Sequence, residues 1–421
     1  MRRSILVKGP LLSRSGYGEQ SRFALRALRS RPDLFQINMV NIPWGRTGQI
    51  AEDSEEARWI RETLVTTHDK MQGSPSNVSI FDISLVISVP NEFERLAPVS
   101  LGYTAGIETT RVSPQWIQQS NKAIDKMIVV SEHSKKVFEN TKYSVKDSHG
   151  QEHIDWGLKI PVEVVNYPVR QASEEPVNIE LETANNFLVV SQWGPRKNLE
   201  NTIKWFVEEF EDDDSAGLIL KTNTASDCVA DRELTSKRLK NILSAHPDRK
   251  CKVYLIHGEL SSGNLTWLYK HPSMKALINI GHGEGYGLPL FEAAYNGLPL
   301  ITIPWSGQMD FICKPNKKGK SYPRINRVDF NLEKVHESAV WNGVIQADAM
   351  WAYAKESSYK RALRDALIKE KHYRQEASAL QEHILENFTE EALYEQFCNL
   401  VNPDHGVAEK YQNFMEMLDE D

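Results

Sequence analysis

Residues 276–299 read ALINIGHGEGYGLPLFEAAYNGLP, and this stretch decides the fold. Its first five residues are mostly apolar and predict a buried strand, and four of the next seven are glycines. Glycine permits backbone conformations and close approaches that a side chain would block. The pattern becomes helical at about Pro289, a residue favoured in the first turn of a helix. A helix N-terminus behind a glycine loop presents free N–H groups and a partial positive charge, which suits a phosphate.

Two glutamates mark the same stretch. Glu284 lies in the loop, and Glu292 lies about one turn into the helix. Carboxylates bind sugar hydroxyls well because they accept two or more hydrogen bonds, so the two acids can contact separate hydroxyl-bearing parts of one ligand. The alternative is a plain strand–turn–helix with Glu292 as a buried capping acid, since a glycine-rich turn alone is weak evidence.

The rest of the chain repeats this alternation of short apolar runs and amphipathic stretches, which predicts parallel sheets. Its 421 residues exceed one ordinary core, and a polar, proline-containing segment at 166–186 predicts a linker. We therefore predict an α/β protein with two doubly wound domains, 1–168 and 169–390, facing across a cleft. A helical segment, 391–421, is expected to pack back on the first domain and to end in an acidic tail, EMLDED. The predicted strands are 4–7, 83–89, 126–130, 162–165, 187–190, 218–220, 253–256, 276–280 and 300–303, and the predicted helices include 19–28, 132–140 and 199–210.

Charge is unevenly distributed. Residues 1–180 hold 22 basic and 22 acidic side chains, so the remainder holds 28 and 35 and carries the whole net charge of −7. Residues 1–32 nevertheless hold eight basic side chains and one acid. A cluster of basic side chains can attract an anionic substrate. The alternative is that these side chains simply cover the solvent-exposed face of a helix.

Composition also limits the location and chemistry of the protein. No window approaches about 18 apolar residues, and the apolar run near the start is too short for a secretory signal. The four cysteines are scattered without a C-x-x-C pair, which argues against a zinc ribbon or a disulfide framework. We expect a soluble, cytoplasmic protein.

A second motif, QWGPRKNL, occupies residues 192–199 directly after a predicted strand. Arg196 and Lys197 place two adjacent cations at a strand-to-helix turn, where a diphosphate can be gripped by the fork of one and the point charge of the other. Surface cations are the alternative, but cations are unfavourable at a helix start unless an anion binds there.

The Glu284-(seven residues)-Glu292 spacing within EGYGLPLFEAAYNGLPLI (284–301) resembles the hallmark of glycosyltransferase family 4 and its GT-B relatives. This resemblance implies two Rossmann-like domains, with Glu284 facing the donor sugar and Glu292 the ribose hydroxyls. It also implies that Arg196 and Lys197 neutralise the leaving nucleoside diphosphate. The residues implied to bind the donor in the glycine loop and helix are His282, Gly285, Tyr286, Gly287, Leu288 and Glu292.

Two N-terminal motifs extend the resemblance. SRSGYGEQSR (13–22) is similar to the glycine loop that approaches the donor phosphates from the opposite domain, which implicates Gly16, Tyr17 and Gly18. Ser21 replaces the third glycine of a dinucleotide fingerprint, which argues against NAD. GYTAGIETTR (102–111) resembles a family 4 subgroup at a position where many relatives carry a histidine. No histidine lies between residues 90 and 132, so Glu108 is the candidate catalytic replacement, with a structural carboxylate as the alternative.

The resemblance implies a retaining transfer of a hexose or pentose from a UDP- or GDP-linked donor. On this mechanism no protein nucleophile is needed, because the leaving phosphate accepts the proton of the acceptor. The donor region lacks an Asp-x-Asp string for a metal-bound diphosphate, so neither a metal nor another cofactor is expected.

The acceptor is open between two classes. Most family relatives glycosylate carbohydrates or lipid-linked sugars. The texture around VPNEFE (89–94) instead resembles enzymes of large tailed bacteriophages, some of which modify hydroxymethylcytosine in DNA; a phage enzyme would act in the host cytoplasm. Two other functions are disfavoured. The chain lacks the pattern of carboxylates and histidine expected of a GT-B epimerase. A non-catalytic nucleotide-sugar binder would be expected to lose the acids and cations that this chain retains.

Overall fold

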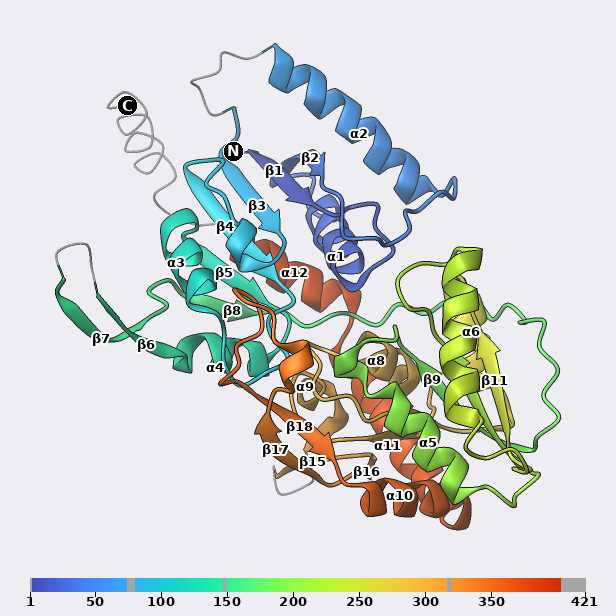
Figure 1. Cartoon of the computed structure of the whole chain (residues 1–421). Coiled ribbons are helices and arrows are strands. Elements are labelled where there is room, and N and C mark those ends of the chain that lie inside the picture. The colour runs from blue at the N-terminus through green and yellow to red at the C-terminus, as the bar shows by residue number, and fades with distance from the viewer. Residues whose placement is uncertain (1, 74–79, 147–149, 316–319, 403–421) are drawn as a thin grey trace. The chain divides into compact units, whose positions relative to one another are not determined.

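The structure is a computed structural model that describes residues 2–73, 80–146, 150–315 and 320–402 (Figure 1). The chain divides into two compact units, each with its own sheet. Unit 1 comprises the described residues of Met1–Tyr167, Val340–Gln346 and Glu390–Asp421, and unit 2 those of Pro168–Ala339 and Ala347–Thr389. The boundary thus follows Tyr167, within the predicted linker, and no helix or strand is formed between Val164 and Asn185. The predicted acidic tail lies outside the described residues.

Unit 1 is built on six parallel strands in the order β2-β1-β3-β4-β5-β8. Every residue of the central strands β3 and β4 is buried, as expected for a parallel sheet covered on both faces. The strands are β1 (Arg3–Gly9), β2 (Phe35–Asn41), β3 (Ile83–Ile87), β4 (Val99–Thr104), β5 (Lys126–Val129) and β8 (Val162–Val164). The helices are α1 (Gly16–Arg29), α2 (Glu55–Gln72), α3 (Pro114–Ala123), α4 (Glu132–Asn140) and α12 (Glu390–Val401), with a 3₁₀ turn at Pro90–Glu92.

Helix α12 returns from the end of the chain to pack on unit 1. The ring of Phe397 lies 5.3 Å from that of Phe23 on α1, and the buried Cys398 thiol donates to the carbonyl oxygen of Ala27 at 3.0 Å. Lys126 donates to the carbonyl oxygen of Leu400. These contacts join the last described helix to the first helix and to β5.

Unit 2 has a second sheet of six parallel strands, in the order β11-β10-β9-β12-β13-β16. Its core includes the mutually packed rings of Phe187, Phe206 and Phe210. The strands are β9 (Asn185–Val190), β10 (Ala216–Lys221), β11 (Lys252–Ile256), β12 (Met274–Asn279), β13 (Leu300–Thr302) and β16 (Asn326–Arg327). The helices are α5 (Leu199–Glu209), α6 (Val229–Leu243), α7 (Ser262–Lys270), α8 (Leu288–Tyr295), α9 (Met309–Ile312), α10 (Glu356–Ile368) and α11 (Glu370–Asn387), with 3₁₀ turns at Pro195–Lys197 and Glu337–Ala339.

Three antiparallel pairs are attached to the two sheets. Unit 1 carries β6 (Lys142–Lys146) with β7 (Glu152–Gly157). Unit 2 carries β14 (Cys313–Pro315) with β15 (Ser321–Pro323), and β17 (Phe330–Lys334) with β18 (Met350–Ala354). Of the helices in the described part of the chain, none is long and apolar enough to cross a membrane.

The predicted α/β class is confirmed, and every predicted strand is present with small changes at its ends. The strands that were not predicted are β2, β4, β6, β7 and β14 to β18. In β2 and in the pair β6–β7, polar residues interrupt the apolar pattern. Helix α1 begins at Gly16, three residues before the predicted start at Glu19. The Ser15 side chain caps this helix by accepting from the Gly18 N–H at 3.0 Å, which draws both glycines into the first turn.

Candidate functional site

The carboxylate of Glu284 is the centre of the predicted donor site. It accepts hydrogen bonds from Lys197 Nζ at 2.6 Å, from Arg196 Nη1 at 3.0 Å and from Asn279 Nδ2 at 2.9 Å. Its residue is only 6% exposed, so the three donors replace water around the charge. The two motifs that the sequence singled out therefore meet at one carboxylate. Asn279, the last residue of β12, was not predicted.

The cations decide the charge of Glu284. Burial alone would raise the pKa of this carboxyl, but Lys197 and Arg196, with the hydrogen bond from Asn279, outweigh burial and lower its pKa to about 2. Glu284 is therefore ionised at neutral pH. An ionised carboxylate with so low a pKa is a poor base and has no proton to donate, so it can only accept hydrogen bonds.

The two loops that carry these residues are locked together by backbone contacts. The N–H of His282 donates to the carbonyl oxygen of Arg196 at 2.8 Å, and Arg196 Nη1 donates to the carbonyl oxygen of Gly283 at 2.6 Å. Asn198 adopts φ of 53°, a left-handed conformation that asparagine tolerates, and its side chain donates to the carbonyl oxygen of Ile280 at 3.1 Å. The loops after β9 and β12 are thus held together by several hydrogen bonds, and we call this pair of loops the floor of the site.

A third loop, after β13, supports the glycine loop and was missed by the sequence reading. Ser306, at φ of 71°, accepts from the N–H of Glu284 through Oγ at 2.9 Å, and Gly307 N donates to the carbonyl oxygen of Glu284 at 2.9 Å. A Cβ on Gly307 would lie 1.9 Å from the carbonyl oxygen of Gly285, so only glycine fits. The signal available in the sequence was the turn-forming string Pro-Trp-Ser-Gly (304–307) directly after a predicted strand.

Helix α8 begins where the glycines end. Gly287, at φ of 95°, caps the helix, and Leu288 is its first residue, so the Leu288 N–H has no partner within the helix. Glu292, half-buried, accepts from the hydroxyl of Tyr269 on α7 at 2.9 Å. The Tyr286 ring instead packs in the core against Phe291 and Phe311, so this side chain shapes the loop from below.

His282 is held as a neutral ring beneath the loop. Its Nδ1 lies 2.9 Å from the carbonyl oxygen of Ala352, which can only accept, so Nδ1 carries the proton and Nε2 is an acceptor. Its ring stacks on Trp351 with centroids 5.2 Å apart. Burial lowers the pKa of His282, and the charge of Arg196 lowers it further.

The corresponding sheet edge of unit 1 gathers the other predicted residues. The Tyr17 hydroxyl lies 2.8 Å from Thr104 Oγ1, at the end of β4, and accepts from the N–H of Ala105 at 3.3 Å. Burial raises the pKa of Tyr17. Glu108 is half-buried on the loop that follows β4. Gly18 packs so closely that a Cβ would lie 1.9 Å from the carbonyl oxygen of Ser13, whereas Gly16 is open.

His133 supports the loop that carries Glu108. Its Nε2 donates to the carbonyl oxygen of Thr109 at 3.2 Å, and burial lowers its pKa to about 4. It is therefore neutral at physiological pH, and its hydrogen bond supports the backbone of this loop.

The basic stretch at the N-terminus is largely neutralised within unit 1. Arg22 and Arg26 share Glu19, and Arg26 also pairs with Glu56 of α2 at 2.6 Å. Six of its eight cations form ion pairs with acids of the same unit, namely Lys8, Arg14, Arg22, Arg26, Arg29 and Arg31. The predicted attraction of an anion by this stretch is correspondingly weak, because α2 brings acids that are distant in sequence.

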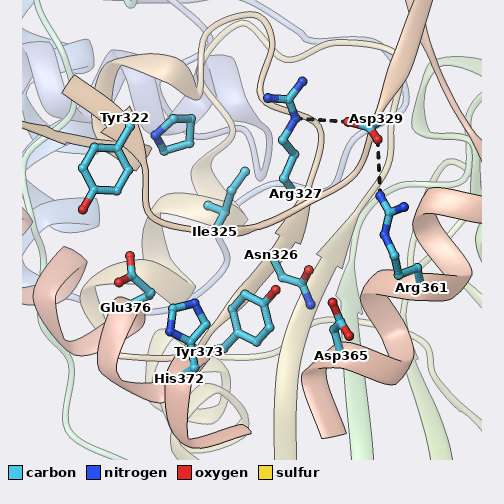
Figure 2. A pocket seen from close by; sticks show the side chains of 11 residues that line it. Tyr322, Ile325, Asn326, Arg327, Asp329, Arg361, Asp365, His372, Tyr373 and Glu376 are labelled. Carbon is cyan, nitrogen blue, oxygen red and sulfur yellow. Dashed lines mark hydrogen bonds and ion pairs between the residues drawn. The ribbon is translucent and has the colours of Figure 1, made fainter. Parts of the chain in front are cut away.

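Unit 2 also has a polar pocket of about 520 Å³ beside β16 (Figure 2). Figure 2 shows Asp329 paired with both Arg327 and Arg361, at 3.2 and 3.3 Å. None of the predicted site residues, all of which the structure describes, lines it. We assign it no role in the site.

Comparison of the structure with solved structures identifies its fold. It is similar over 95% of its length to sucrose-phosphate synthase from Thermosynechococcus elongatus, covering 98% of that chain with a TM-score of 0.59 and 13% identity. A structure of HepE from Anabaena in complex with UDP-glucose gives a TM-score of 0.54 at 11% identity, with 95% and 99% of the two chains covered. The lipopolysaccharide outer core galactosyltransferase WaaB gives 0.52 at 12% identity, with 95% and 99% covered.

The fold is GT-B. Its two Rossmann-like domains correspond to the sheets of units 1 and 2. The chain spans 55% of the length of TarM from S. aureus, another structure that it matches, with a TM-score of 0.48. No protein-family model and no curated protein sequence matches the chain.

Proposed function

We propose that this protein is a retaining glycosyltransferase that moves a hexosyl or pentosyl group from a UDP- or GDP-linked sugar to an acceptor hydroxyl. The observation that carries the proposal is the buried Glu284 carboxylate held by Lys197, Arg196 and Asn279 at the carboxyl edge of the unit 2 sheet. Ligands of open α/β sheets bind at this edge. The GT-B fold and the UDP-glucose in the HepE structure agree with a nucleotide-sugar donor.

Each polar group has a role in this reaction. Glu284 accepts hydrogen bonds from the donor sugar, and Glu292 accepts them from the ribose. Lys197 and Arg196 stabilise the charge that develops on the departing diphosphate, together with the N–H of Leu288 at the start of α8. A guanidinium has five donors and an ammonium three, so both cations can contact phosphate while they remain on Glu284.

The proposed transfer retains the configuration of the anomeric carbon. Glu284, with a pKa of about 2, is a weak base, and its proposed role is to accept hydrogen bonds from the sugar. In a front-face transfer, the bond from the anomeric carbon to the leaving phosphate oxygen breaks while the acceptor oxygen forms a bond on the same face. The acceptor proton passes to that phosphate oxygen, and the cationic floor stabilises the charge.

The first experiment identifies the donor. Purified protein is incubated with a panel of labelled UDP- and GDP-sugars, and slow hydrolysis and binding are measured. One donor should turn over, and the absence of turnover or binding with every donor would sink the enzyme proposal. Lys197→Ala should lower turnover by roughly 10²-fold or more with little change in folding, the effect expected for one lost charge-stabilising donor; Lys204→Ala, on an exposed face of α5, is the matched control.

Metal dependence is tested in the same assay. We predict that EDTA leaves the turnover unchanged, because two cations and the helix start supply the positive charge at the diphosphate. A loss of activity that Mg²⁺ or Mn²⁺ restores would contradict this prediction.

The acceptor is tested separately. A carbohydrate or a lipid-linked sugar is one class, and hydroxymethylcytosine in DNA is the alternative. Mass spectrometry of nucleosides from hydroxymethylated DNA, treated with enzyme and donor, distinguishes them. A hexose or pentose adduct assigns DNA, and its absence favours the carbohydrate or lipid class.

A further inference from the structure

A groove on unit 1 has the chemistry of a binding site and lies outside the donor site. It has a volume of about 740 Å³ and runs between helix α3 and the β6–β7 hairpin. Figure 1 labels α3, β6 and β7, all of which belong to unit 1. The ten residues that line the groove include none that is acidic: Pro114, Gln115, Gln118, Asn121, Lys122, Val145, Lys146, His153, Trp156 and Lys159.

Three cations of this groove are unmatched. Lys122, Lys146 and Lys159 are exposed, and within the described ranges of the chain no acid forms an ion pair with any of them. This differs from the N-terminal basic stretch, where six of eight cations are paired. The groove is therefore a place on unit 1 where positive charge remains available to a ligand.

The other lining groups suit a ligand that carries more than charge. Gln115, Gln118 and Lys122 lie on one face of α3, at spacings of three and four residues. The half-buried indole of Trp156 lies opposite, on β7. Carboxamides can donate and accept hydrogen bonds, and an aromatic face can stack on a planar ring.

The groove is anchored to the loop that carries Glu108. Arg111 donates to the carbonyl oxygen of Lys142 at 2.7 Å and lies over the Tyr143 ring at 4.3 Å. The Tyr143 hydroxyl donates to the carbonyl oxygen of Val112 at 2.5 Å. The β6–β7 hairpin, which forms one wall of the groove, is therefore joined by direct contacts to the loop that carries Glu108.

The hairpin is also fixed to α3 itself. Asn121 donates to the carbonyl oxygen of Gly157 at 3.1 Å and accepts from the N–H of Lys159 at 2.8 Å. One asparagine therefore holds both walls of the groove in place, and the cation of Lys159 is positioned by a fixed backbone.

From these features we infer that the groove binds a nucleic acid strand, with the three lysines on phosphates and Trp156 stacked on a base. Phosphates position such a chain, and base contacts with the amides and the indole add affinity that a bare polyanion lacks. As the acceptor side of a transferase, the groove rests on the proposed function, although the binding itself can be tested without a donor.

The test is fluorescence anisotropy of a labelled 20-nucleotide single-stranded DNA and its duplex, titrated with the full chain over a series of salt concentrations. The triple variant Lys122→Gln, Lys146→Gln, Lys159→Gln should lower single-strand affinity at least tenfold at low salt. The slope of log K against log salt should become shallower by about 2, from three lost contacts at roughly 0.7 each. Trp156→Leu should lower affinity roughly tenfold with no change in slope, since stacking carries no charge. These lysines are exposed, so the triple variant tests the groove even if Trp156→Leu unfolds.

The matched control is Lys204→Gln, Lys250→Gln, Lys252→Gln on unit 2, which removes the same charge from three exposed positions. The inference is overturned if wild type does not bind DNA at low salt, if the control loses as much affinity as the groove variant, or if polyphosphate competes as well as DNA. Nucleotide-sugar hydrolysis, measured on both the wild type and the groove variant, separates the two proposals. If the wild type hydrolyses the nucleotide sugar but does not bind DNA, only the groove inference is rejected. If it binds DNA but turns over no nucleotide sugar, only the proposed enzyme activity is rejected.

Discussion

The carboxyl edges of the two sheets hold their polar groups in different ways. In unit 2, Glu284 is surrounded by two cations and an amide, all drawn from residues of the same unit. In unit 1, Tyr17 is held by the Thr104 hydroxyl and a backbone N–H, and Glu108 is half-buried on a loop supported by His133. The unit 2 edge therefore holds a charged group, Glu284, in a fixed position. The group held at the unit 1 edge, the Tyr17 hydroxyl, is neutral.

The difference follows the chemistry proposed for each edge. A leaving diphosphate develops charge, and fixed cations stabilise it without reorganisation during the reaction. The unit 1 edge, where the acceptor is proposed to bind, instead needs space for the acceptor and polar groups that can hydrogen-bond to it. Charge at the unit 1 surface is supplied at the α3 groove, by lysines without acid partners among the described residues.

The largest effect is expected from Glu284→Gln. The substitution keeps the side-chain shape but removes the charge between Lys197 and Arg196, so turnover of the donor should fall by about 10²–10³-fold. Hydrolysis of the identified nucleotide sugar measures the effect, and circular dichroism controls for folding. Near-normal turnover in a folded variant would mean that the unit 2 edge is not the donor site.

Glu108→Gln tests the unit 1 edge. Acceptor-dependent transfer should fall by about 10²-fold, because the carboxylate is proposed to hold the acceptor hydroxyl in place and a misplaced reactant costs about that much, while slow hydrolysis of the donor is retained. The two rates are measured in parallel on the same protein. If both fall together, Glu108 acts on the donor, and if neither falls, it is the structural carboxylate that closes a turn.

The third prediction concerns the glycines that shape each edge. Gly307→Ala in unit 2 and Gly18→Ala in unit 1 each push a Cβ to 1.9 Å from a backbone oxygen and should lower stability by about 1–3 kcal/mol. Gly16→Ala, with no atom within 4 Å of its Cβ, should be neutral within about 0.5 kcal/mol. Thermal unfolding measures all three, and an equal loss for Gly16→Ala would contradict the packing argument.

The smallest expected effect is on the pH dependence of stability, and it concerns Glu284 at the unit 2 edge. The pKa of Glu284 is lowered from 4.5 to about 2, so its ionised form favours the folded state. This stability is fully present above pH 4.5 and is lost as the pH falls toward 2. The difference in thermal midpoint between wild type and Glu284→Gln should therefore shrink over that window. A difference that stays constant from pH 6 to pH 2.5 would show that Glu284 is not held by its cations.

Nine of the strands and the two motifs of unit 2 could be predicted from the sequence alone. These features are local: apolar runs, glycines and the spacing of Glu284 and Glu292 are visible within a few residues. Sequence also marked Arg196 and Lys197, because adjacent cations at a helix start call for an anion. The same local reasoning placed the start of α1 three residues late, because the Ser15 cap outweighs two glycines.

Only the tertiary structure decided which groups meet. Arg196 and Glu284 are 88 positions apart, and Ser306 reaches the loop from yet another strand, so no window of sequence joins them. It likewise showed that Arg26 and Arg29 pair with acids of α2, while the lysines between α3 and β7 form no ion pair in the described residues. Charge pairing depends on distance in space, and a parallel sheet brings distant loops together at one edge.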